Sequence, residues 1–421
     1  MLIALALFAV TYVLMIIFQK YRPYIALTSA AIYIISGMLP LHKIVEYVDL
    51  NVLFMIAGTM GTVYLTIKSK MPARLADLIL DKVPNVKWTI VTLCLFAGIV
   101  SAFIDNVATV LMIAPIAMAI SKRLNINPVP MIISIAVSSN LQGAATLVGD
   151  TTSILLGGYA EMNFLDFFIY NNKPGIFFAV ELGALVSAIM LLIIFKKETA
   201  PVSSDQITKV EDYVPSILLL ATVLGLIIAS IIPNTPDMIN GTICITIMII
   251  GALYNAIKTK SLSGLMEPVR EIDFETLFLL LGLFMVIGGI TEMGVVDAVS
   301  NIFTRIGGGN IFLIYTLIVW LSVLFSAFID NIPYVATMLP VTQGIANAIG
   351  IDPTLLYFGL LSGATLGGNL TPIGASANIT GIGILRKSGH EVKNSDFFKI
   401  GIPFTLGAII PAYIFLLIFY Y

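Results

Sequence analysis

Charged residues and cysteines are scarce in this chain of 421 residues, and each shortage excludes a class of protein. Charged residues make up 11% of the sequence, hydrophobic residues make up 58%, and the mean hydropathy is +1.01. Soluble domains carry about 25% charged residues, so an ordinary soluble protein is excluded. The two cysteines, Cys94 and Cys244, lie inside apolar runs, so we expect neither a disulfide framework nor a metal site.

Long apolar runs recur instead from one end of the chain to the other. About 20 such residues are needed for a helix to cross ~30 Å of hydrocarbon. The ~10-residue alternating segments of an outer-membrane barrel are absent. The first run, residues 1–18, lacks the basic start and small-residue cleavage site of a signal peptide, so we expect a retained helix. We predict an all-α polytopic membrane protein with simple spans near residues 2–18, 24–40, 51–67, 174–195, 214–232, 237–257, 275–295 and 398–420.

Four further apolar segments are longer than one crossing or carry polar residues in their middle. Segments 88–120 and 310–348 could each be a re-entrant hairpin or two crossings, whereas 129–157 and 355–384 contain glycine-rich breaks. Cytoplasmic loops hold an excess of lysine and arginine. If both hairpins return to their starting side, all basic residues except Lys43, Lys173 and Arg305 fall on one side. This count predicts a cell-membrane protein with both termini outside and the connectors 68–87 and 196–213 inside.

The two halves of the chain resemble each other at a constant offset. Sliding the sequence by 225 residues pairs SAFIDN at 101–106 with SAFIDN at 326–331, and GAATLVGDTTSI at 143–154 with GNLTPIGASANI at 368–379. With a one-residue slip, DLNVLF at 49–54 pairs with DFETLF at 273–278. This is an internal duplication. An odd number of crossings, five per half with one interrupted, inverts the second copy, which is the architecture of secondary transporters.

This duplication divides the chain. We predict a first inverted repeat over residues 1–197, a cytoplasmic linker over 198–213 and a second inverted repeat over 214–421. Each repeat contains one hairpin, at 88–120 or 310–348, and one interrupted helix, at 129–157 or 355–384.

The polar residues inside these apolar segments are the candidates for binding. A carboxylate within a membrane costs at least a few kcal/mol unless it faces a cavity or a partner. Asp105 and Asp330 at the hairpin tips could cap broken helices, bind an ion, or do both. The small and hydroxyl residues of the two breaks favour unwound backbone around a cavity over simple helix packing. Asp150, whose equivalent is Ala375, could carry a proton or sodium or act as a cap.

Basic residues are expected to be missing from this site. All 22 lysines and arginines fall in loops or at span ends, which favours a cation, a proton or a weakly charged substrate over a multiply charged anion. His42 and His390 lie in loops, so a histidine proton relay is not expected. No P-loop occurs, and transport would therefore be driven by a gradient or by a separate ATPase subunit.

The hairpin tips and both break motifs resemble the ion transporter superfamily, in the branch of arsenite-efflux permeases, the P protein and D-type sodium/proton antiporters. The resemblance implies two inverted repeats and a homodimer with scaffold and transport domains. Dicarboxylate carriers of this superfamily have Ser-Asn-Thr at both breaks, whereas this chain has SSNL at 138–141 and ATL at 364–366. This difference argues against a di- or tricarboxylate substrate. By this resemblance and their place in the same motifs, the residues expected at the site are Asp105, Asn106, Thr109, Asn140, Gly143, Thr146, Gly149, Asp150, Thr151, Asp330, Asn331, Asn369, Thr371, Gly374, Ser376 and Asn378.

Several functions remain open from the sequence. The first is proton-coupled efflux of arsenite or a similar small oxyacid, with Asp105, Asp150 or Asp330 carrying the proton. The alternatives are a sodium/proton antiporter and a citrate-type carboxylate transporter. An intramembrane aspartyl protease needs two carboxylates that share a proton, but the duplication explains the aspartates without it. We expect no enzyme activity, no cofactor beyond H⁺ or Na⁺ as coupling ion, no metal beyond transient Na⁺ at the same residues, and no nucleic-acid partner.

Overall fold

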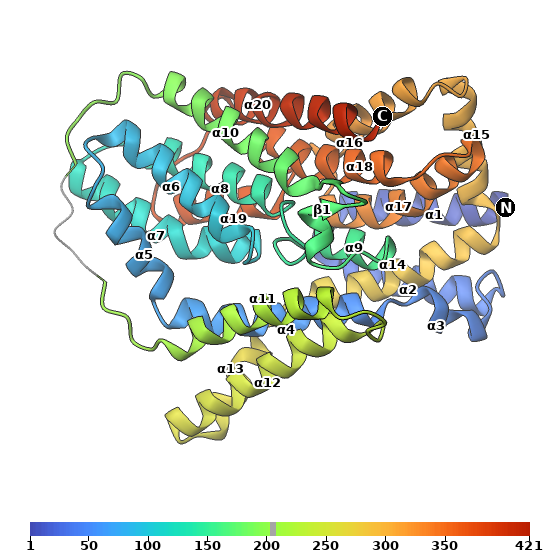
Figure 1. The fold of residues 1–421 in the computed structure, drawn as a ribbon, viewed down its shortest axis with the longest axis horizontal. Helices are drawn as coiled ribbons and strands as arrows, with labels where there is room; N and C mark the ends of the chain where they lie inside the picture. Colours follow the sequence, from blue (N-terminus) through green and yellow to red (C-terminus); the bar gives the residue numbers. More distant parts are fainter. Residues whose placement is uncertain (203–207) are drawn as a thin grey trace.

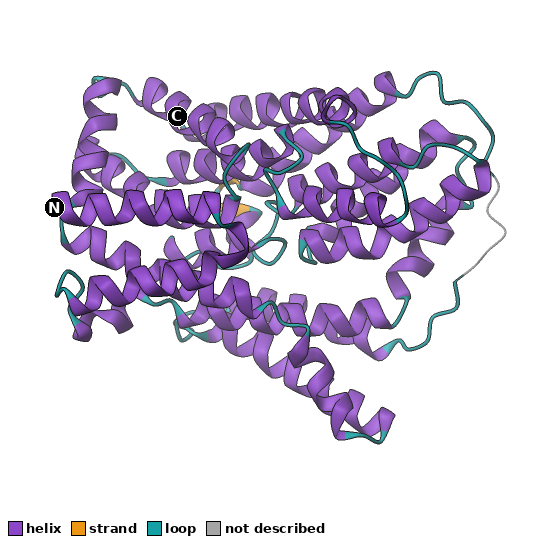
Figure 2. Ribbon diagram, turned by 180° about the vertical axis from the view of Figure 1, so that it is seen from behind, coloured by secondary structure: helices purple, strands orange, loops and turns teal. Residues whose placement is uncertain are grey.

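The computed structural model describes residues 1–202 and 208–421, and these residues form twenty α-helices, four short 3-10 helices and one small hairpin of strands. Figures 1 and 2 show the helices running largely along the long axis of the molecule. Strands β1 (Ile169–Tyr170) and β2 (Lys173–Pro174) pair antiparallel. The predicted all-α class is confirmed. The centre of the predicted linker, residues 203–207, lies outside the described residues.

The apolar runs form helices at the predicted places, but the predicted separate spans 2–18 and 24–40 are long enough to cross a membrane only as one bent pair. Seven described helices are individually long and apolar enough to cross a membrane. Two further pairs pass the same test together, each bent by 119°: α1 (Leu2–Ile17) with α2 (Arg22–Ile35), and α15 (Val295–Gly307) with α16 (Ile311–Ser326). The seven single helices are α4 (Leu50–Lys68), α7 (Asn106–Leu124), α10 (Ile176–Ile194), α11 (Val214–Ile231), α12 (Ile239–Thr259), α14 (Phe274–Glu292) and α20 (Asn394–Tyr420).

The two predicted hairpins and the two predicted interrupted helices occur at equivalent places. The hairpins are α6 (Val86–Ser101) with α7, and α16 with α17 (Asn331–Ile349). The interrupted helices are α8 (Val129–Gln142) with α9 (Thr151–Tyr159), and α18 (Thr354–Gly367) with α19 (Ser376–Lys387), the second break holding the 3-10 turn η4 (Gly368–Leu370). Each of these helices in the second half begins 225 residues after its counterpart. The duplication in sequence is therefore also a duplication in structure.

Short helices between the spans are absent from the sequence prediction. They are α3 (Ile44–Tyr47), α5 (Met71–Leu80), α13 (Leu262–Arg270) and α15, together with the 3-10 turns η1 (Gln19–Tyr21), η2 (Leu41–Lys43) and η3 (Leu165–Phe167). Helices α5, α13 and α15 carry one buried and one exposed face, an amphipathic pattern that hydropathy windows of about 19 residues average away.

Each repeat packs one of its helices against the other repeat. Helix α2 of the first half packs along α14 of the second, and its counterpart α12 packs along α4. Equivalent glycines allow both close approaches: a Cβ atom at Gly58 would collide with the backbone of Cys244, and one at Gly282 would lie 2.7 Å from the carbonyl carbon of Ala26. Figure 1 draws α5, α6 and α7 at one end of the molecule and α15, α16 and α17 toward the other. This is the placement that inverted repeats require.

Candidate functional site

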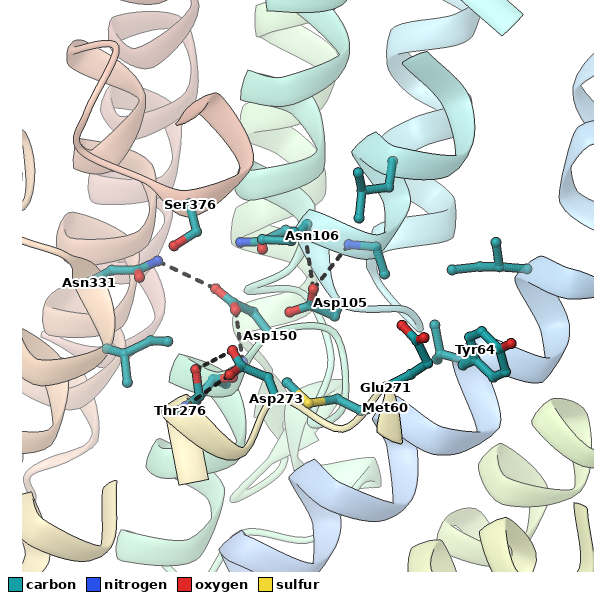
Figure 3. A pocket seen from close by; sticks show the side chains of 17 residues that line it. Met60, Tyr64, Asp105, Asn106, Asp150, Glu271, Asp273, Thr276, Asn331 and Ser376 are labelled. Atoms are coloured by element: carbon teal, nitrogen blue, oxygen red, sulfur yellow. Dashed lines mark hydrogen bonds between the residues drawn. The ribbon is translucent and has the colours of Figure 1, made fainter. Parts of the chain in front are cut away.

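A cavity of about 240 Å³ lies where the two repeats meet. The first repeat contributes the tip of the α6–α7 hairpin and the start of α9, and the second contributes the starts of α17 and α19. Helices α4 and α14 supply the remaining wall. Figure 3 shows the polar side chains of these elements around the same space.

Both hairpin aspartates cap the helix that follows them. Asp105 accepts hydrogen bonds from the backbone N–H groups of Val107 (3.0 Å) and Ala108 (3.1 Å). Asp330 accepts one from Ile332 (3.1 Å). These N–H groups at the helix start have no partner within the helix, and the carboxylates satisfy them. The expected capping role is confirmed for both residues.

Asp150 caps α9 and connects the two repeats. Its carboxylate accepts hydrogen bonds from the backbone N–H of Thr151 (2.8 Å) and the hydroxyl of Thr152 (3.1 Å). The amide of Asn331, from the other hairpin, reaches the same carboxylate at 3.5 Å, and Figure 3 shows the two side chains pointing toward each other. Asp150 is buried and lines the cavity.

Two acidic residues that the sequence did not predict at the site also line the cavity. Glu271 is the C-cap residue of α13, and Asp273 is the N-cap residue of α14. Asp273 accepts hydrogen bonds from the backbone N–H (3.1 Å) and hydroxyl (2.6 Å) of Thr276. Asp273 begins the DFETLF motif that pairs with DLNVLF, so the duplication itself was the available signal. The cavity lining thus holds four carboxyl groups, with Asp105 and Asp150, and no lysine or arginine. Such a lining attracts cations.

A buried amide network holds the two repeats together behind the cavity. Asn106 donates to the Asn140 side chain (3.0 Å), and Asn140 donates to the Thr365 carbonyl (2.7 Å) and to the Asn369 side chain (3.1 Å). Asn369 in turn donates to the Val137 carbonyl (2.8 Å). Asn140 and Thr365 occupy equivalent positions in the two repeats, so this network joins the repeats at the same point of each.

Equivalent threonines attach each helix break to the neighbouring hairpin tip. The Thr146 hydroxyl donates to the Ala102 carbonyl, and the Thr371 hydroxyl donates to the Ala327 carbonyl. At the second break, Asn378 donates to the carbonyls of Gly368 (3.1 Å) and Thr371 (3.2 Å). These side chains position the tips.

The expected site residues therefore divide into two groups. Asp105, Asn106, Asp150, Thr151, Asn331 and Ser376 line the cavity. The others build its frame or lie beside it: Thr109, Asn140, Gly143, Thr146, Gly149, Asp330, Asn369, Thr371, Gly374 and Asn378.

Arg22 reaches the site, and the expectation that no basic residue does so is wrong. Its guanidinium lies 2.9 Å from the Asp330 carboxylate, and both side chains are largely buried. Helices α1 and α2 have 16 and 14 residues, fewer than the ~20 that one crossing needs. The turn between them consequently places Arg22 beside the hairpin tip rather than in a solvated loop.

The whole chain matches known transporters. The model of the CitMHS family, described as citrate transporter, matches residues 12–363. This chain belongs to the CitMHS family. An uncharacterized transporter of Mycobacterium tuberculosis is 30% identical to this CitMHS member over 100% of the present chain and 98% of its own length. The human P protein is 24% identical over 95% of this chain and 58% of its own.

A solved structure supports the fold of this CitMHS chain. The YdaH transporter of Alcanivorax borkumensis, whose structure is described as having an unusual topology, superposes with a TM-score of 0.61 over 89% of this chain and 86% of its own. At 14% identity the likeness concerns the fold alone. Together these matches establish a multi-pass membrane transporter of the ion transporter superfamily.

Proposed function

We propose that this protein is a secondary active transporter whose coupling cation, H⁺ or Na⁺, binds at Asp105 and Asp150. The observation that carries the proposal is the cavity lined by four carboxyl groups and no basic side chain. Asp150 is buried and Asp105 is half-buried, and no described ion pair joins either of them to a basic side chain, so binding of a cation or a proton there is favourable. The same carboxylates sit on helix starts at the meeting point of the two repeats, where a change in repeat packing alters their access.

As transported solute we propose a small, uncharged or weakly charged oxyacid, of which arsenous acid is the first probe. Such a solute needs no basic residue, and Arg22 beside the cavity is already paired with Asp330. Hydroxyl and amide groups of Thr151, Ser376 and Asn106 at the cavity offer it hydrogen bonds. The proposed process is efflux in exchange for protons.

The family match favours a second candidate, a carboxylate of the citrate type. An acidic cavity repels a free carboxylate, so such a substrate would enter only together with a neutralising cation. For either substrate we place the protein in the cell membrane with both termini outside and propose a homodimer.

Proteoliposomes that contain the purified chain and an internal pH dye separate these substrates. With a preset pH gradient, arsenite, sodium chloride and potassium citrate are added in separate runs. We expect arsenite to change the internal pH, which supports the oxyacid. A response to sodium alone supports sodium/proton exchange, and a response to citrate alone supports the carboxylate.

The double variant Asp105→Asn/Asp150→Asn tests the coupling role in the same vesicles. We expect it to abolish every response, because amides bind neither a proton nor sodium with the strength of a carboxylate. Asp237→Asn, in the exposed loop between α11 and α12, is the matched control and retains the response. Full activity of the double variant, or silence of the wild-type protein toward all three solutes, would contradict the proposal.

A further inference from the structure

The duplication places two related half-sites around the hairpin tips. The first half-site consists of Asp105, Asp150 and Thr151, and the second consists of the equivalent residues Asp330, Ala375 and Ser376. In both, the aspartate caps the second hairpin helix and the hydroxyl residue begins the second half of the interrupted helix. Two identical half-sites would offer a cation two equivalent places to bind.

The two half-sites differ in charge. The first holds two carboxylates, and no described ion pair connects either of them to a basic side chain. The second has one carboxylate fewer, since Ala375 stands at the position equivalent to Asp150. Its remaining carboxylate, Asp330, pairs with Arg22. The first half-site therefore keeps a net negative charge that a cation shared by its two carboxylates can compensate, whereas the charges of the second already cancel.

Arg22 is held in this position from both sides. Its Nε donates to the Met15 carbonyl of α1 (3.2 Å) while its guanidinium contacts the Asp330 carboxylate (2.9 Å). The same carboxylate oxygen receives a weaker contact from the Ser376 hydroxyl at 3.4 Å. The Tyr12 hydroxyl of α1 donates to the Pro333 carbonyl of α17 (2.7 Å), so α1 is also attached to the second hairpin.

A guanidinium fixed on a carboxylate does for that carboxylate what a bound cation does. It supplies a positive charge and charge-assisted hydrogen bonds, and it removes the need for an ion or proton from solution. Both side chains are little exposed, 17% for Arg22 and 13% for Asp330, so the pair is weakly screened by solvent.

We infer that Arg22 takes the place of a coupling cation at the second half-site, so that the protein binds one coupling cation per chain, at the first half-site, instead of two. The inference rests on the proposed coupling role of Asp105 and Asp150. It makes Arg22 a residue that determines stoichiometry: without its charge, Asp330 becomes a second acceptor for a cation.

Cation counting on the purified full-length chain tests the inference. Bound radioactive sodium is counted at saturation, and proton uptake is counted separately between mildly alkaline and neutral pH, so that carboxylates that become protonated only in acid are not included. Both numbers are compared with those of the triple variant Asp105→Asn/Asp150→Asn/Asp330→Asn, which subtracts binding at surface groups. We expect one cation per wild-type chain, two for Arg22→Gln, and one for Arg22→Lys, which keeps the charge.

Additional variants keep the outcome decisive. Arg22→Gln/Asp330→Asn removes both charges of the pair and returns the count to one. If Arg22→Gln does not fold, Asp330→Asn alone serves: the count stays at one, because Asp330 holds no cation in the wild-type protein. Two cations on the wild-type chain, one on a folded Arg22→Gln, or none on Asp330→Asn would each overturn the inference.

The failure of this inference differs from a failure of the proposed function. A wild-type count of two that falls in Asp105→Asn/Asp150→Asn contradicts only the role of Arg22. A wild-type count that is unchanged in Asp105→Asn/Asp150→Asn contradicts the coupling role itself.

Discussion

Single glycines determine how closely the helix breaks approach the hairpin tips. A Cβ atom at Gly149 would lie 2.6 Å from the Gly143 carbonyl oxygen and 2.9 Å from those of Ser101 and Ala102. Gly374 has the same surroundings in the second repeat, with the carbonyl oxygens of Gly368, Ser326 and Ala327 at 2.6 to 2.9 Å. At these two positions no side chain fits without movement of the backbone. The breaks of both interrupted helices therefore depend on residues that bear no chemistry of their own.

We expect Gly149→Ala to destabilise the protein by about 1–3 kcal/mol, the usual cost of overpacking, and to weaken cation binding at the neighbouring Asp150. The measurements are the midpoint of thermal unfolding in detergent and sodium binding. Gly383→Ala is the matched control, since Gly383 lies in α19 with open space around it. Alanine is favoured there by up to about 1 kcal/mol. Equal stability of the two variants would show that the contact at Gly149 is unimportant.

Among the elements, the short amphipathic helix α15 links the spanning helix α14 to the second hairpin. Its buried face includes Val296 and Ser300, whereas the exposed residues form one polar stripe (Asp297, Asn301 and Arg305) and one apolar pair (Ile302 and Ile306). A helix with two such adjacent exposed stripes fits the plane of the membrane interface, with the apolar pair toward the acyl chains.

Cysteine labelling tests this placement of α15. In lipid nanodiscs we expect Asn301→Cys to react with a water-soluble maleimide at least about tenfold faster than Ile302→Cys, because water reaches only the polar stripe. The native cysteines are buried and contribute little background. Both positions are exposed in the protein alone, so equal rates would place the whole face in water and refute the interfacial position.

At the scale of the whole molecule, two copies of one helical unit enclose an acidic cavity. The exchange of α2 and α12 between the halves makes the repeats interdependent, because each half packs one of its helices on the other. The cavity forms only where both hairpin tips and both breaks meet. The function we propose therefore belongs to the assembled pair of repeats and to neither half alone.

Opposite orientation of the repeats is testable with two equivalent connections. Lys82→Cys lies between α5 and α6, and Arg305→Cys lies at the end of α15, before α16. In intact cells we expect a membrane-impermeant maleimide to label Arg305→Cys and to leave Lys82→Cys unlabelled until the membrane is permeabilised. Labelling of both positions from the same side would contradict the inverted arrangement and the predicted orientation.

Much of the fold was predictable because its signals are local. The apolar runs, the hairpins and the breaks at Gly143–Asp150 and Gly368–Ala375 occupy nearly the predicted residues, since span length and helix-breaking residues act within about 20 positions. The short helices α5, α13 and α15 were missed because windows that detect spans average out an amphipathic turn. Asp105 and Asp150 were found as charges within apolar surroundings, whereas Glu271 and Asp273 looked like ordinary loop acids at the start of a span.

The sequence by itself determined that the chain is a membrane protein, that it is duplicated, and that its polar residues concentrate at two tips and two breaks. These properties follow from hydropathy and from the comparison of the chain with itself. Only the tertiary structure decided which carboxylates share a cavity and that Arg22 meets Asp330 across 308 residues of sequence. Contacts between distant segments depend on how the helices pack, which the sequence does not show directly. Arg22 looks like a basic residue in a loop, but the bend between α1 and α2 places it against Asp330 at the tip of the second hairpin.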